Sequence, residues 1–208
     1  MRFVAISDTH NLHHPMRLPA GDVLVHAGDI TLKGTRDEVM VFLDWFEQQK
    51  FKHKIFIAGN HDFIMEQMKE SDLKKIIPSN VIYLSDSGIN IHGINIWGSP
   101  ITPWFYNWAF NRHRGPEIQK HWKLIPAGTE LLVTHGPVYG FLDMVVDETH
   151  VGCQDLLRTV LTIQPKVHLF GHIHESYGNI KRSGIRFINA SQVNEHYQLV
   201  NQPVVFDL

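Results

Sequence analysis

The sequence predicts an α/β fold with a layered sheet core, and two features of its pattern support this prediction. Short runs of apolar and β-branched residues recur along the chain, and each has the length of a buried strand. Amphipathic helical patterns separate some of these runs. Strands that alternate with helices pack as sheets covered by helices. We expect strands at residues 2–7, 23–26, 54–58, 81–84, 89–97, 131–134, 167–170, 186–189 and 204–207.

Three helices are expected between these strands. The clearest has its apolar residues on one face, and Thr35 with Glu38 forms a capping-box pair at its start. The second must stop before Pro78 and the third before Pro165, because the residue that precedes a proline is biased away from helix. We expect the helices at residues 35–49, 63–77 and 153–163.

Length and composition predict a single domain that spans residues 1–208. A chain of 208 residues with 43% hydrophobic residues can bury a sizeable core. The formal net charge of -2 gives no electrostatic footprint for a nucleic-acid or membrane partner. Cys153 is the lone cysteine, and the chain opens on the strand-like MRFVAIS with no apolar run of about 18 residues anywhere. We therefore expect a soluble, cytoplasmic protein, and Cys153 to be a buried residue at a helix start.

Five polar clusters each follow one of the predicted strands directly. Because ligands of open α/β sheets bind beyond the carboxyl ends of the strands, such clusters can converge although they are far apart in sequence. Each cluster also has an ordinary structural interpretation as a turn or a helix cap. The whole set has no comparable structural explanation, since it combines two carboxylates, an amide and four imidazoles with glycines. The clusters are Asp8-Thr9-His10, Gly28-Asp29, Gly59-Asn60-His61-Asp62, Thr134-His135-Gly136 and Gly171-His172-Ile173-His174.

This mixture of side chains predicts a site for two divalent transition-metal ions. Oxygen and nitrogen ligands without thiolate suit manganese, iron, zinc or cobalt, and Mn²⁺ is the ion we expect. One carboxylate can bridge two ions, and two carboxylates leave an excess of positive charge that attracts an anion. Water activated between the ions could then attack a bound phosphate ester in line. The expected ligands are Asp8, His10, Asp29, Asn60, His135, His172 and His174.

The order D-x-H, G-D, G-N-H-D, H-G and G-H-x-H resembles that of the calcineurin-like metallophosphoesterases. The resemblance covers essentially the whole chain, which is similar to the small single-domain branch that includes the brain metallophosphoesterase-domain proteins. It implies two facing, mostly mixed β-sheets flanked by helices. Beyond the ligand motifs, it rests on GSPITPWFYNWAFN at 98–111, THGPVYGF at 134–141, VGCQDLL at 151–157, FGHIHESYG at 170–178, INAS at 188–191 and the final PVVFDL.

The resemblance also implies a role for each residue. A first metal would be held by Asp8, His10, Asp29 and His174, and a second by Asp29, Asn60, His135 and His172. Asp29 would bridge the two ions, and a bridging hydroxide would attack phosphorus. Asn60 and His61 would contact the substrate. His61 would be no ligand but a general acid that protonates the leaving oxygen, and Asp62 would fix the orientation of its ring.

The stretch 99–115 is long, irregular and aromatic, which is typical of a functional loop. A nucleotide base could stack on Trp104 or Phe105, although filling a core is the ordinary role of any single ring. We expect one or two of the rings at the site and assign Trp104 and Phe105 to substrate binding.

The predicted activity is hydrolysis of phosphodiesters or phosphomonoesters, with small nucleotides, cyclic ones included, as substrates. One alternative is a non-catalytic module that binds other proteins, as some relatives with eroded ligand sets do. Another is a nuclease that acts on DNA or RNA ends, but the acidic balance disfavours it. The complete ligand set favours the enzyme.

Overall fold

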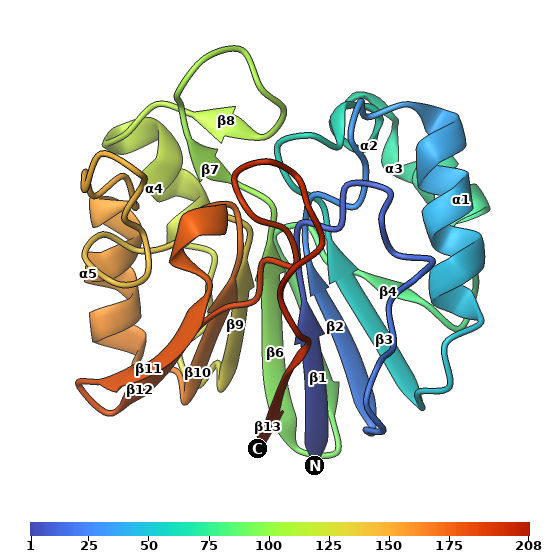
Figure 1. Cartoon of the computed structure of the whole chain (residues 1–208). Helices are drawn as coiled ribbons and strands as arrows, with labels where there is room; N and C mark the ends of the chain where they lie inside the picture. The colour runs from blue at the N-terminus through green and yellow to red at the C-terminus, as the bar shows by residue number, and fades with distance from the viewer.

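Two β-sheets face each other at the centre of the computed structural model, which describes residues 1–208 (Figure 1). The first sheet has the order β13 (Val204–Asp207), β1 (Arg2–Ile6), β2 (Val23–Ala27), β3 (His53–Ile57) and β4 (Ile82–Tyr83). The second has the order β11 (Gly178–Arg182), β12 (Ile185–Asn189), β10 (Val167–Phe170), β9 (Leu131–Thr134), β6 (Ile94–Ser99) and β5 (Ser87–Ile91). Both sheets are mixed. Parallel strands form their centres, and antiparallel strands form their edges, except that β4 at the edge of the first sheet runs parallel to β3. The expected pair of facing mixed sheets is confirmed.

Helices cover the outer faces of both sheets. In Figure 1, α1 (Arg36–Glu47), α2 (Phe63–Gln67) and α3 (Glu70–Ile76) lie beside the first sheet, and α4 (Pro116–Trp122) and α5 (Gln154–Ile163) beside the second. Thr35 caps α1 through the predicted capping box with Glu38. Cys153 is buried and caps α5, as expected, since its Sγ accepts from the Leu156 N–H at 3.3 Å. None of the helices combines the length and the apolar composition that crossing a bilayer requires.

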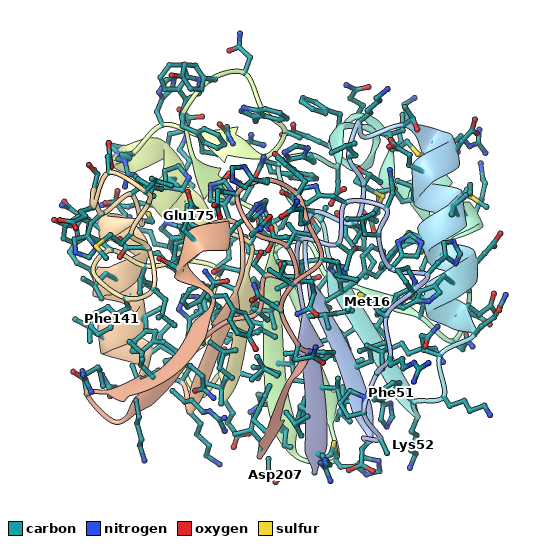
Figure 2. All side chains as sticks on the ribbon, viewed as in Figure 1. Met16, Phe51, Lys52, Phe141, Glu175 and Asp207 are labelled. Atoms are coloured by element: carbon teal, nitrogen blue, oxygen red, sulfur yellow. The ribbon has the colours of Figure 1, made fainter.

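The central strands are buried on both faces, as strands of parallel sheets are. Val25 and Leu169 belong to the apolar layer between the sheets, whereas the neighbouring Leu24 faces the helices together with Phe56. The Phe56 ring packs 5.6 Å from that of Phe42 on α1. Side chains fill both the space between the sheets and the space beneath the helices (Figure 2).

The carboxyl ends of the parallel strands meet at one edge of this sandwich. β1, β2 and β3 run parallel in the first sheet, and β9 and β10 run parallel in the second. The loop from β12 to β13 passes over the same edge, where Figure 1 draws it in dark red. All five polar clusters therefore reach one region, as the topology of open sheets predicts.

Two elements differ from the sequence-based expectation. The single strand expected at 89–97 is wrong, because β5 and β6 form a hairpin with His92 and Gly93 at its turn. Both turn residues have positive φ, 49° and 89°, as a tight two-residue hairpin turn requires. The single helix expected at 63–77 is also wrong, because Met68 is extended and separates α2 from α3. Glu66 of α2 is held by the Phe110 N–H at 2.9 Å, a tertiary contact that the helical pattern does not reveal.

Three further features were not expected from the sequence pattern. β11 adds an antiparallel edge strand beside β12, and α4 follows the aromatic loop. Within the stretch 99–115, β7 (Thr102–Pro103) pairs with β8 (Asn111–Arg112) and closes the loop at its base. The pairing of β7 with β8 therefore holds together the two ends of the loop that carries the aromatic residues.

Candidate metal centre

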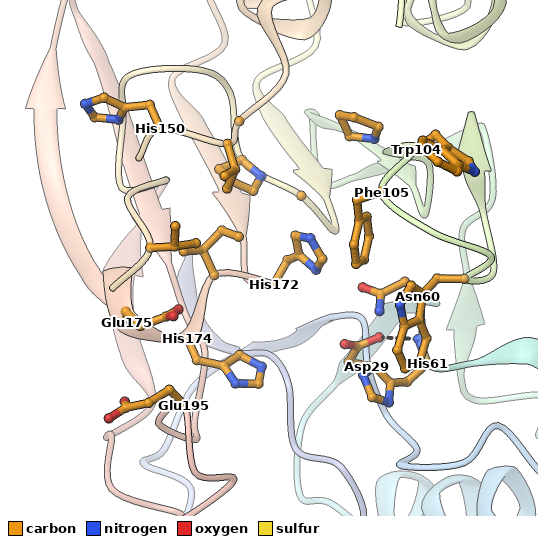
Figure 3. A pocket seen from close by; sticks show the side chains of 18 of the residues that line it. Asp29, Asn60, His61, Trp104, Phe105, His150, His172, His174, Glu175 and Glu195 are labelled. Atoms are coloured by element: carbon orange, nitrogen blue, oxygen red, sulfur yellow. Dashed lines mark hydrogen bonds between the residues drawn. The ribbon is translucent and has the colours of Figure 1, made fainter. Parts of the chain in front are cut away.

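The strand ends bring together three groups of side chains with the spacing of metal ligands. Within each group, one ligand atom per residue lies within 4.8 Å of the others. The groups are Asp8, His10 and His174; His10, Asp29 and His61; and Asp29, His135 and His172. Six of the seven predicted ligands are among them, and the seventh, Asn60, contacts His135 as described below. Figure 3 shows His172 and His174 across from Asp29, Asn60 and His61.

The residues predicted for the first metal come from the ends of β1, β2 and β10. Nε2 of His174 lies 3.6 Å from Oδ1 of Asp8 and 3.4 Å from Nε2 of His10. Nε2 of His10 in turn lies 3.7 Å from Oδ2 of Asp29. Three imidazole and carboxylate donors thus surround one point, with Asp29 at its side.

The residues predicted for the second metal come from the ends of β2, β3, β9 and β10. Nε2 of His135 lies 3.4 Å from Oδ2 of Asp29 and 2.9 Å from Oδ1 of Asn60. The ring of His172 stands 5.0 Å from that of His135. The same oxygen of Asp29 therefore faces a histidine of each group, which is the position that a bridging carboxylate needs.

Backbone carbonyl groups fix the rings of three of these histidines. Nδ1 of His10 lies 3.0 Å from the Thr31 oxygen, and Nδ1 of His135 lies 2.9 Å from the Ala27 oxygen. For His174, the partner is the Asn194 oxygen at 3.2 Å. A carbonyl can only accept, so each Nδ1 carries a proton and each Nε2 is the nitrogen that faces the centre, where it can bind a metal ion once it is deprotonated. Metal-binding histidines are held in this way.

The backbone at the ligands is held in conformations that side chains other than glycine seldom adopt. Asp8, His10, Asp29 and His172 have φ values of 52°, 41°, 56° and 70°. Asp and His tolerate this region better than most residues, but each instance costs on the order of 1 kcal/mol. Glycine is needed beside them, because a Cβ on Gly171 would stand 2.1 Å from Oδ2 of Asp8. Directing these side chains toward the centre therefore lowers the stability of the fold.

The two carboxylates are ionised. Burial alone would raise the pKa of Asp8, but the hydrogen bond and charge of His174 outweigh it and hold this pKa well below its ordinary value. Burial and His135 act on Asp29 in the same opposed way, and its pKa is also lowered. Burial would lower the pKa of His135, but the charge of Asp29 overrides it and raises this pKa to about 9. A proton on His135 occupies the place that a metal would take.

These residues fit two divalent ions. The inward lone pairs of the imidazoles, the ionised carboxylates and the amide oxygen of Asn60 form an oxygen and nitrogen donor set that suits transition metals. Burial lowers the pKa of His172 to about 3, so this ring is neutral and able to bind a cation. Which ion each residue holds stays a prediction.

His61 lies among the ligands, but not in the surroundings that were expected. Nδ1 of His61 lies 2.8 Å from the carbonyl oxygen of Leu32, so the Leu32 backbone orients the ring. The expectation that Asp62 fixes this ring is wrong. The Asp62 carboxylate is buried and accepts from the backbone N–H groups of Gly59, Ile30 and Thr31 at 2.7, 3.2 and 2.9 Å. Asp62 therefore ties the loop after β2 to the loop after β3.

Aromatic rings wall a pocket of about 550 Å³ above the centre. Trp104 and Phe105, the two rings assigned to substrate binding, both line it. The Phe105 ring stands 5.2 Å from His172, and Trp108 stands 4.5 Å from His61. Trp104 is 47% exposed and lies farther out, as Figure 3 shows. Of these rings, Trp104 is thus the most exposed.

The pocket also holds residues that sequence reasoning missed, namely His150, Glu175, Glu195 and Tyr197, and it holds Arg114 of the aromatic stretch 99–115. Glu175 directly follows the expected ligand His174 in a short 3-10 helix, whereas His150, Glu195 and Tyr197 lie in loops outside the five motifs. The carbonyl groups that orient the histidines were missed for a related reason, since every residue has one. Only the folded arrangement identifies both sets.

Comparison with known proteins agrees with this geometry. A family model described as calcineurin-like phosphoesterase matches residues 1–176. The chain is 44% identical over its whole length to the human protein called Metallophosphoesterase domain-containing protein 1, of which it covers 71%. It is 39% identical to UPF0046 protein K07C11.7 of Caenorhabditis elegans, over 99% of this chain and 74% of that protein. The solved structure of TT1561 of Thermus thermophilus has a TM-score of 0.61 over 90% of this chain and 88% of its own, at 12% identity, and shows a likeness of fold alone.

Proposed function

The chain belongs to the calcineurin-like phosphoesterase family, and from this premise we propose that it hydrolyses phosphodiester or phosphomonoester bonds with the help of two divalent metal ions. The family supports metal-dependent phosphoester hydrolysis in general. The substrates we propose are small nucleotides, cyclic ones included, and the metal we propose is Mn²⁺. Two such ions would supply Lewis-acid activation of water and of the phosphoryl oxygens.

One observation supports this proposal more than any other: Oδ2 of Asp29 faces Nε2 of His10 at 3.7 Å and Nε2 of His135 at 3.4 Å. A carboxylate between two sets of inward imidazole lone pairs is suited to hold two cations close together. A site for a single metal ion would not require histidines on both sides of Asp29.

The protein's own residues would hold the ester and move its protons. Nε2 of His61 is the free ring nitrogen, because Nδ1 is bound to the Leu32 carbonyl. A protonated Nε2 can donate to a leaving oxygen, which is the role of a general acid. Trp108, packed 4.5 Å from this ring, restricts its motion. His61 therefore combines a fixed position with one nitrogen available for chemistry.

The pocket supports a nucleotide as the substrate. Its volume of about 550 Å³ falls within the range of small-ligand sites. The exposed face of Trp104 could stack on a base while the phosphate lies near Asp29 and Asn60. Such an arrangement distinguishes nucleotides from simple alkyl phosphates.

Reconstitution tests the proposal. The purified chain would be stripped with EDTA and reloaded separately with Mn²⁺, Fe²⁺, Zn²⁺ or Co²⁺, with metal content measured for each sample. Turnover would then be measured on nitrophenyl phosphate, bis-nitrophenyl phosphate, nucleoside monophosphates and cyclic nucleotides. We expect about two equivalents of metal and metal-dependent hydrolysis, fastest with Mn²⁺. A chain that binds the metals and hydrolyses none of these esters would contradict the proposal.

A further inference from the structure

The ring of Tyr197 packs edge-on against three histidines of the metal centre. Its centroid lies 4.9 Å from that of His10, 5.4 Å from that of His174 and 6.1 Å from that of His61. Tyr197 also lines the pocket, and its side chain is 42% exposed. The residue thus forms pocket wall beside His10 and His174, whereas Phe105 forms wall beside His172.

A tight turn in the loop between β12 and β13 presents this ring. Oδ1 of Asn194 accepts from the N–H groups of His196 and Gln198, each at 3.0 Å. The Tyr197 N–H donates to the Asn194 carbonyl at 2.9 Å, and Tyr197 itself has a φ of 56°. A non-glycine residue in this region is held there by its surroundings.

The turn is locked to the metal centre. The carbonyl of Asn194 that accepts from Tyr197 also lies 3.2 Å from Nδ1 of His174. One peptide group therefore orients a predicted ligand and places the tyrosine next to it. Residue 197 lies beyond the part of the chain that the family model matches, which ends at residue 176.

The hydroxyl of Tyr197 is available to a ligand. Tyr177 donates its hydroxyl to the Gln202 carbonyl at 2.9 Å, whereas the hydroxyl of Tyr197 has no hydrogen bond to the protein. Phe105, which lies beside His172 on the other side of the pocket, carries no hydrogen-bond donor in its side chain. A phenol donates strongly to an anionic oxygen, and a hydrogen bond to a charged group is among the stronger ones.

We propose that Tyr197 is a substrate-binding residue whose phenolic hydroxyl donates a hydrogen bond to a nonbridging phosphoryl oxygen of the bound ester and of the phosphate product. This inference rests on the proposed function and adds a donor that the five motifs do not contain. It places a hydrogen-bond donor for phosphate on the side of the centre where His10 and His174 lie.

The test compares Tyr197→Phe with the wild-type protein, both reconstituted with Mn²⁺. Inorganic phosphate is titrated into each by calorimetry, and kcat/KM is measured on bis-nitrophenyl phosphate. Loss of one hydrogen bond to a charged oxygen should weaken phosphate binding and lower kcat/KM by roughly 10- to 100-fold. Metal content should not change, because the ring that packs on the histidines is kept. Tyr106→Phe is the matched control, since Tyr106 is 74% exposed and lies outside the pocket lining.

Unchanged phosphate affinity and turnover in Tyr197→Phe would overturn the inference and leave Tyr197 as a packing residue. Loss of metal from this variant would also overturn it, because the hydroxyl would then support the ligands. If Tyr197→Phe weakens phosphate binding but the wild-type protein hydrolyses no ester, the inference stands and the proposed function fails. If the wild-type protein binds no phosphate, both fail.

Discussion

His61 Nδ1 and the Leu32 carbonyl oxygen stand 2.8 Å apart, so a backbone group fixes the ring of the proposed general acid. The contact assigns the proton on Nδ1 and leaves Nε2 facing the centre, where His10 and Asp29 are also found. The same nitrogen could hold a metal or donate a proton. The distinction between these two roles is open to experiment.

His61→Ala should keep both metals and still hydrolyse nitrophenyl esters appreciably, because nitrophenolate leaves without a proton. Alkyl or ribose-linked phosphates should slow by roughly 10²- to 10⁴-fold, since their leaving oxygens need one. His172→Ala should impair both substrate classes. The measurements are kcat/KM on both classes and metal content. Loss of metal from His61→Ala, or equal slowing of both classes, would contradict the general-acid role.

Asp29→Asn should disrupt the whole centre, because the Asp29 carboxylate faces a histidine of each metal group. An amide cannot supply the negative charge that compensates two cations. We expect metal content after Mn²⁺ loading to fall from about two equivalents to below one, with turnover lost. Asp44→Asn, at an exposed position on α1, is the matched control. Near-normal metal content in Asp29→Asn would show that the bridging assignment is wrong.

Trp104→Ala should raise KM for nucleotides roughly 10-fold and leave small nitrophenyl phosphates unaffected, because the exposed indole offers a stacking face to a base. Phe105→Ala should impair both substrate classes, because the Phe105 ring packs 5.2 Å from His172. Steady-state kinetics on both classes separates the two rings. Equal losses for both classes in Trp104→Ala would assign Trp104 to packing.

The convergence of the polar clusters could be predicted because strand ends are visible in the sequence. An apolar run that stops at Asp8 or His135 marks the end of a strand, and parallel strands bring such ends to one edge. The break between α2 and α3 could not be predicted in this way. It lies beside the contact of Glu66 with the Phe110 N–H, which joins residues far apart in sequence. The turn at His92 and Gly93 was missed because apolar residues continue on both sides of it.

The motifs identified which side chains meet, but not what holds them. Asp62 stands beside His61 in the sequence and was expected to contact its ring, but its carboxylate turns to the N–H groups of neighbouring loops. Adjacent residues often point in different directions, so sequence proximity is a poor guide to side-chain contact. Tyr197 shows the converse, since it reaches His10 from a distant loop.

Asp62→Asn should destabilise the fold rather than change catalysis selectively. The Asp62 carboxylate accepts from three backbone N–H groups and from the Thr31 hydroxyl, the last at 2.6 Å, and an amide would turn an NH₂ group toward some of these donors. We expect the free energy of unfolding to fall by roughly 2–3 kcal/mol. Urea unfolding in EDTA measures this value without a metal contribution, and Asp37→Asn at an exposed position is the control. Unchanged stability with a large loss of kcat would restore the catalytic role of Asp62.

Buried His168 should make the metal-free fold sensitive to acid. Burial lowers the pKa of His168 to about 3, while its ring packs 4.9 Å from that of Phe170 and its Nε2 lies 2.8 Å from the Thr134 hydroxyl. The pKa of His168 in the folded chain lies below its unfolded value of about 6.5. Below pH 6.5 the unfolded chain therefore binds a proton on this ring, whereas in the folded chain the ring stays neutral. The stability associated with neutral His168 is therefore complete above pH 6.5 and is lost as the pH falls toward 3. Between about pH 6.5 and 5 the loss should be about 2 kcal/mol.

His168→Phe should remove this loss of stability, because a phenyl ring binds no proton in either the folded or the unfolded chain. Urea unfolding in EDTA at pH 7, 6 and 5 would give the free energy of unfolding of both proteins. At pH 7 the variant should be no more stable than the wild type, since the contact with Thr134 is gone. Its free energy of unfolding should, however, decline less steeply toward pH 5. His196→Gln, at an exposed histidine, controls for the loss of one imidazole. Parallel pH profiles for His168→Phe and the wild type would show that His168 does not contribute to the acid sensitivity of the fold.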